Sequence, residues 1–123
     1  MKKQKITSFT DLEVWKLGHE LVLEIYRITK SFPKSEIYGL TNQMRRASVS
    51  ITSNIAEGFG RKGYKEKIQF YYHSIGSLIE IKNQILIAKD LKYFKPEKDF
   101  IEKINSVHKL LNGLITASKK RCS

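Results

Sequence analysis

Apolar residues recur along this chain at the three- and four-residue spacing of one helical face, in four successive segments. Their positions are Val14, Gly18, Leu21, Ile25, Ile28 and Phe32; Leu40, Met44, Ala47, Ile51 and Ile55; Ile68, Tyr71, Tyr72, Ile75, Leu78, Ile79, Ile85 and Leu86; and Phe100, Ile104, Val107, Leu111 and Leu114. No segment has a convincing strand pattern. The spacing predicts helices over approximately residues 11–32, 36–57, 64–91 and 97–119, joined by short turns. We therefore expect an all-α, antiparallel up-down-up-down four-helix bundle, in a single domain over residues 1–123.

Local signals place the ends of the first two helices. Thr10 and Glu13 have the spacing of a capping box, which predicts the start of the first helix. Pro33 is expected to end that helix, because proline disfavours helical geometry in the residue before it. The second helix is expected to begin at Ser35 and to end at Gly58, which suits a left-handed cap.

The second helix is unusually poor in charge. No Lys or Arg occurs from Ala47 to Glu57, and nearly every side chain there is small. Val49, Ser53 and Ala56 lie on the face opposite its apolar stripe, so that face is not an ordinary solvated one. Small side chains let neighbouring backbones approach closely. The segment therefore indicates tight packing within the bundle or between copies.

The third helix has more apolar surface than one bundle interior needs. Phe70 and Ile81 widen its apolar arc to over half the circumference. Contact with another subunit explains this surplus, so we predict a homo-oligomer. The residues expected in the oligomer interface or in packing are Val49, Ser53, Asn54, Ala56, Glu57, Phe70 and Ile81.

The net charge of the chain suggests a class of binding partner. The chain has 23 Lys and Arg against 12 Asp and Glu, a formal net charge of +11, which favours a polyanion. Three basic groups stand out: Arg45 with Arg46; Arg61 with Lys62 and Lys65; and the tail Lys119, Lys120 and Arg121. They form one phosphate-binding surface only if folding or assembly brings them together. Otherwise they solubilise helix ends.

Reactive chemistry is not indicated by the pattern of residues. His19, His73 and His108 stand alone on three different helices, without the spacing of a helical metal site. The segment 58–63 is rich in glycine but lacks the Gly-Lys-Ser/Thr ending of a phosphate loop. We expect no metal, no cofactor and no enzymatic activity.

Two polar residues near the end of the second helix fit a structural role. Asn54 and Glu57 lie one turn apart, and only one of them titrates, so they are expected to fix packing through hydrogen bonds. Cys122 is the only cysteine, which fits a reducing cytoplasm. No segment approaches the roughly 20 apolar residues of a membrane span. We expect a cytoplasmic protein without a membrane partner.

Ordered motifs along most of the chain resemble one known family, the four-helix bundle proteins named for 23S rRNA intervening sequences. The matching residues are Asp11-Leu12-x-Val14-Trp15; Phe32-Pro33-Lys34 with Tyr38-Gly39-Leu40-Thr41; Gln43 to Ile51; Ser53 to Arg61; Gly76-Ser77-Leu78 with Glu80; and Ala88 with Asp90-Leu91. The resemblance implies a four-helix bundle that assembles as a ring-like homopentamer. It also implies a distant relation to the accessory variability protein of diversity-generating retroelements, which works with a reverse transcriptase and binds nucleic acid.

The chain departs from the family pattern at three positions. Thr52 stands where the family often has proline, so the kink that proline would impose is not implied here. Gly63 replaces a common serine that would cap the third helix, and Lys67 replaces an aromatic or apolar residue. The last change either weakens a packing contact or adds charge to the basic turn.

Two functions follow from these observations. The first is a non-enzymatic, homo-oligomeric nucleic-acid-associated protein that contacts RNA phosphates through Arg45, Arg46, Arg61, Lys62 and Lys65. The alternative is a protein-interaction scaffold or adaptor that presents its surface to another protein, such as a nucleic-acid enzyme, without binding nucleic acid itself.

Overall fold

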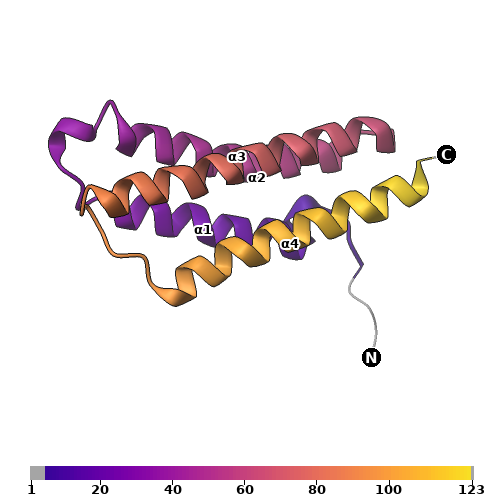
Figure 1. Ribbon diagram of the computed structural model, residues 1–123. Helices are drawn as coiled ribbons and strands as arrows, with labels where there is room; N and C mark the ends of the chain where they lie inside the picture. The colour runs from indigo at the N-terminus through magenta and orange to yellow at the C-terminus, as the bar shows by residue number, and fades with distance from the viewer. Residues whose placement is uncertain (1–4, 123) are drawn as a thin grey trace.

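The computed structural model describes residues 5–122, and these residues contain four α-helices and no strand (Figure 1). The helices are α1 (Glu13–Thr29), α2 (Leu40–Gly60), α3 (Tyr64–Asp90) and α4 (Lys98–Arg121). Residues 1–4 and 123 of the expected domain lie outside the described part. None of the described helices is long and apolar enough to cross a membrane.

The core is built from the predicted apolar stripes. α2 packs against α1 and α3, and α4 packs against the same two helices. Leu21, Ile51, Leu78 and Leu111, one from each helix, are fully buried and belong to one cluster. The stripe of α4 is slightly rotated from the prediction, because Ile115 is buried where Leu114 was expected.

The first helix is capped earlier than predicted and ends earlier. Thr10 and Glu13 do not form the expected capping box. Instead, Ser8 and Asp11 form one around a 3-10 helix, η1 (Phe9–Asp11), in which Asp11 Oδ2 accepts the Ser8 amide hydrogen at 3.0 Å. α1 then begins at Glu13 and ends at Thr29, whose hydroxyl donates to the Ile25 carbonyl at 2.7 Å.

The second helix begins later than predicted, at Leu40 and not near Ser35. Residues Lys34–Glu36 form a 3-10 helix, η2, because Pro33 starts the turn and Glu36 caps the helix that follows. The Glu36 carboxylate accepts the Leu40 amide hydrogen at 3.1 Å and the Tyr93 hydroxyl hydrogen at 2.7 Å. These two bonds hold the pKa of Glu36 below its ordinary value, the Tyr93 bond being the stronger cause.

Gly58 was expected to be a left-handed cap, and this prediction is wrong. α2 continues through it to Gly60, and no glycine in the described residues has a positive φ. The close fit of α2 against α3 requires the glycine instead. A Cβ atom at position 58 would come 2.7 Å from Cε1 of Tyr71 and 2.9 Å from Cβ of Phe70.

A left-handed residue does end the third helix, but it is Lys92, with φ of 63°. The Lys92 amide donates to the Lys89 carbonyl and the Tyr93 amide to the Ala88 carbonyl, both at 2.9 Å. This pair of bonds is a Schellman motif without its usual glycine. It turns Tyr93 toward Phe32, with ring centroids 5.3 Å apart.

Candidate nucleic-acid interface

Two of the three predicted basic groups meet at one end of the bundle. The turn between α2 and α3 carries Arg61, Lys62 and Lys65, and the end of α4 lies at the same end of the molecule (Figure 1). The Arg121 guanidinium carbon lies 5.9 Å from the centroid of the Tyr64 ring, and Lys119 Nζ lies 5.4 Å from that of Tyr72. We call this surface the basic end, and its residues are Arg61, Lys62, Lys65, Lys119, Lys120 and Arg121.

The cations of the basic end are accessible. All of them are exposed. Arg61 pairs with Glu57 and with Glu66, each at 3.9 Å. Pairs this long between exposed side chains contribute little and leave the guanidinium free to exchange partners. Within residues 5–122, Lys62 and Lys65 form no ion pair.

Lys67 is the charged residue at the turn that has a structural role. Its Nζ donates to the Phe59 carbonyl at 2.6 Å and more weakly to the Gly58 carbonyl at 3.4 Å. These carbonyls belong to the last turn of α2, where helix geometry leaves carbonyls short of backbone donors. The Gly58 carbonyl also accepts the Arg61 amide hydrogen at 3.2 Å. Lys67 therefore stabilises the end of α2 and the negative end of its dipole. At this position an aromatic or apolar side chain would make a packing contact, whereas Lys67 caps the end of α2.

The third basic group does not join the basic end. Arg45 and Arg46 lie on α2 about 24 Å from Arg61, at 1.5 Å per residue. Arg45 is partly buried: its Nε donates to Thr29 Oγ1 at 2.9 Å, and its guanidinium carbon lies 4.8 Å from the Tyr26 ring centroid. Arg45 is therefore a link between α1 and α2.

Arg46, its neighbour in sequence, is exposed and lines a shallow groove of about 370 Å³. Asn42, Gln43 and Ser50 of α2 and Glu80 of α3 complete the charged and polar lining. Of the two arginines, only Arg46 has a guanidinium available for a phosphate.

The outer surface of α2 keeps the small, uncharged character that the sequence indicated. Val49 and Ser53 are exposed and Ala56 is half-buried. Asn54 bonds within its own helix, its amide donating to the Ser50 carbonyl at 2.8 Å. Ser50 in turn accepts a hydrogen bond from Ser77 of α3 at 2.8 Å. We call Val49, Ser53 and Ala56 the α2 outer surface.

Three other residues expected in packing or in an interface have different environments. Ile81 is fully buried in the core of the chain, so it is not available to another subunit. Phe70 is half-buried, with Arg61 4.7 Å from its ring centroid. Glu57 is exposed and not a buried hydrogen-bonding group.

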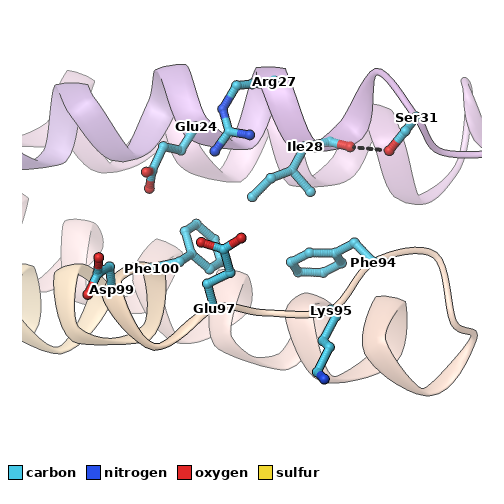
Figure 2. Close-up of a pocket in the computed structure, with 9 residues that line it drawn as sticks. All are labelled: Glu24, Arg27, Ile28, Ser31, Phe94, Lys95, Glu97, Asp99 and Phe100. Carbon is cyan, nitrogen blue, oxygen red and sulfur yellow. Dashed lines mark hydrogen bonds between the residues drawn. The ribbon is translucent and has the colours of Figure 1, made fainter.

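The opposite end of the molecule has a pocket of different charge. It has a volume of about 350 Å³ and lies between α1 and the connection into α4. Figure 2 shows the Glu24, Arg27 and Glu97 side chains directed toward it, beside the rings of Phe94 and Phe100. The only hydroxyl in its lining, that of Ser31, donates to the Ile28 carbonyl at 3.0 Å. Three carboxylates, Glu24, Glu97 and Asp99, line this pocket together with the cations Arg27 and Lys95, so its charge is mixed.

Fold and charge together define the class of protein: a small all-α chain of four helices with a cluster of exposed cations where α2 meets α3 and α4 ends. The model of the 23S rRNA-intervening sequence protein family matches residues 10–113, which is most of the chain. The chain belongs to this family. A comparison with curated proteins finds no match.

Proposed function

We propose that this protein is a non-enzymatic, homo-oligomeric basic bundle that associates with nucleic acid, in particular RNA, through phosphate contacts. Convergence of the α2–α3 turn and the α4 tail at the basic end is the observation that carries the proposal. The family description, which refers to rRNA, favours RNA over DNA. The pentameric state follows only from the resemblance, and the cytoplasmic location follows from the single cysteine, Cys122. Both remain part of the proposal, as does an associated nucleic-acid enzyme.

The helix order that we infer is up-down-up-down. Contacts between helices support this order, because the residue numbers increase along one helix while those of their partners decrease along the next. Gly18 approaches Thr52, and Thr29 bonds Arg45, between α1 and α2. Between α2 and α3, Ser74 bonds the Ile51 carbonyl and Ser77 bonds Ser50. This order puts the second connection and the C-terminus at one end, as the basic end requires.

Phosphate contacts of this kind give affinity with little sequence readout. Lysine binds phosphate as a point charge, and each neutralised phosphate releases counterions. Tyr64 is half-buried between Lys67 and Arg121, with both cations 5.9 Å from its ring centroid. The Tyr64 ring therefore packs against these two cations more than it offers a surface on which an RNA base could stack. Several copies in one assembly would add weak contacts through effective concentration.

The proposal is tested by fluorescence anisotropy with a structured RNA and a duplex DNA, titrated across salt concentration. We expect affinity to fall steeply with salt. In Lys62→Ala/Lys65→Ala, the slope of log K against log salt should decrease by about 0.7 to 0.9 for each phosphate that the variant no longer neutralises.

The matched control is Lys30→Ala/Lys34→Ala, which removes the same charge from exposed positions at the opposite end of the bundle. It should change the slope much less. Absence of binding at low salt, or equal slopes in the two double variants, would show that the basic end does not carry the interaction.

A further inference from the structure

Apolar side chains follow the boundary between α3 and α4 on the surface of the chain. Tyr72, Ile79 and Leu86 recur every seven residues along α3 and are 47%, 52% and 56% exposed. Ile101 of α4 is exposed beside Leu86. Leu86 and Ile101 are large aliphatic residues, yet neither belongs to the buried core, whereas Ile85 and Ile104 do.

This boundary is hollowed. Two cavities, of about 550 Å³ and about 190 Å³, adjoin because both are lined by Ile85, Leu86 and Ile101. The apolar stripe from Tyr72 to Leu86 extends about 21 Å, at 1.5 Å per residue, which is the length of a four-turn helix. We call these cavities, with the Tyr72 and Ile79 side chains that continue them, the α3–α4 groove.

The charge around the groove has one sign. The charged residues lining its two cavities are Lys82, Lys89 and Lys95, and no carboxylate lines either one. None of the three lysines forms an ion pair within residues 5–122. Lys82 Nζ instead donates to His108 Nδ1 at 2.8 Å, and Lys119 lies over the Tyr72 ring. The groove therefore has an apolar floor and a rim of cations without counter-charges.

From this arrangement we infer that the α3–α4 groove binds an amphipathic helix of another protein, with apolar residues on one face and Asp or Glu beside them. A helix laid in a groove anchors through positions i, i+3, i+4 and i+7 of its own apolar face, and the exposed residues of α3 repeat at the same seven-residue interval. Carboxylates on its flanks would pair with the rim lysines, and pairs shielded from water contribute specificity and rate of association.

Charge and polarity favour an acidic amphipathic helix over a nucleic acid or a second copy of the chain as the occupant of the groove. A nucleic acid would place phosphates against isoleucine and leucine, which satisfy no hydrogen bond. A second copy of the chain has 12 Asp and Glu against 23 Lys and Arg, so it offers the rim lysines fewer carboxylates than an acidic helix does. The two cavities of the groove share no lining residue with the basic end or the α2 outer surface, and only Tyr72 touches the basic end, through Lys119. The inference therefore does not depend on the proposed RNA binding.

The probe is a fluorescein-labelled helical peptide of about 18 residues, roughly 27 Å long, with leucine along one face and glutamate beside it. It is titrated into the full chain and followed by anisotropy. Two matched peptides accompany it: one with lysine for every glutamate, and one of the same composition scrambled to destroy the apolar face. We expect the first to bind at least about tenfold more tightly than either, which corresponds to about 1.4 kcal/mol.

The variants Ile79→Asn and Leu86→Asn should weaken that peptide about tenfold or more, because both side chains are exposed anchors. Leu23→Asn is the matched control, since Leu23 is 57% exposed on α1, outside the groove. Equal binding of the scrambled peptide, or an equal loss in the Leu23 variant, would overturn the inference. So would a fall in oligomer mass in Leu86→Asn, which would show a second copy in the groove. RNA affinity of Leu86→Asn should stay unchanged.

Discussion

Single residues set how closely the helices approach. Gly58 has helical geometry and no left-handed φ, so glycine is needed there only because it has no Cβ atom. Arg45 and Arg46 are adjacent and identical, yet one bonds Thr29 across to α1 and the other is exposed. The difference arises from the turn of about 100° between successive helical positions, which directs one side chain toward α1 and the other away.

Gly58→Ala should destabilise the chain by about 1–3 kcal/mol, because the new methyl group would overlap the Tyr71 ring and the Phe70 Cβ. Gly76→Ala is the matched control: Gly76 is helical and exposed, and a Cβ there meets nothing within 4 Å. Alanine at position 76 should stabilise the helix by about 0.5–1 kcal/mol. Urea unfolding measures both, and equal shifts would mean that the α2–α3 contact is looser than described.

At the scale of elements, polar contacts fix which helix faces which. Ser77 bonds Ser50 between α3 and α2, and Lys103 joins α4 to Glu20 and Glu24 of α1 at 3.7 and 3.5 Å. Between α3 and α4 the corresponding contact is Lys82 with His108, in which the neutral imidazole accepts. That contact depends on the charge of the histidine.

The Lys82–His108 contact should make stability depend on pH. Burial first, and the Lys82 ammonium second, lower the pKa of His108 below its ordinary value of 6.5. The unfolded chain then binds this proton more readily than the folded chain does. Stability is therefore complete above the ordinary pKa and is lost as pH falls through it toward the lowered value.

We expect the urea midpoint to decrease between about pH 7.5 and about pH 5.5, the range of histidine titration. In His108→Gln, whose side-chain oxygen can still accept from Lys82, this decrease should be smaller. The same decrease in both proteins would assign the pH dependence to other groups.

At the scale of the whole molecule, charge is unevenly distributed. Six exposed cations lie where α2 meets α3 and where α4 ends, with Glu57 and Glu66 beside them. Exposed cations are also present at the other end, but in the pocket there Arg27 and Lys95 are accompanied by Glu24, Glu97 and Asp99. The α2 outer surface between these ends has small uncharged side chains and is the face that we propose for self-assembly.

Val49→Glu and Ala56→Glu should dissociate the proposed oligomer, because each places an unpaired carboxylate in an interface at a cost of several kcal/mol. Thr116→Glu is the control, since Thr116 is exposed on α4, which packs against α1 and α3 and not against α2. Light scattering gives the mass and circular dichroism the fold. A wild-type monomer, or an unchanged assembly in both variants, would exclude this face as the interface.

Apolar spacing was enough to predict four helices and the buried face of α1 and α2, because this spacing is local. On α3 the predicted arc was too wide, since Tyr72, Ile79 and Leu86 are exposed. Leu40, Met44, Ala47, Ile51 and Ile55 are all buried as predicted. Helix ends were predicted less well: Ser8, Glu36 and Lys67 cap through side chains whose partners depend on turn geometry or tertiary contact.

Which charges lie side by side depends on how the helices pack. Arg61 and Arg121 are 60 positions apart in the chain, yet both lie at one end of the bundle. Arg45, in contrast, is held against α1 by its hydrogen bond to Thr29. Spacing within a helix does not specify how its neighbour is rotated or where the next helix ends. Residues distant in sequence therefore meet, or fail to meet, according to packing, and the candidate surfaces of this protein are defined at that level.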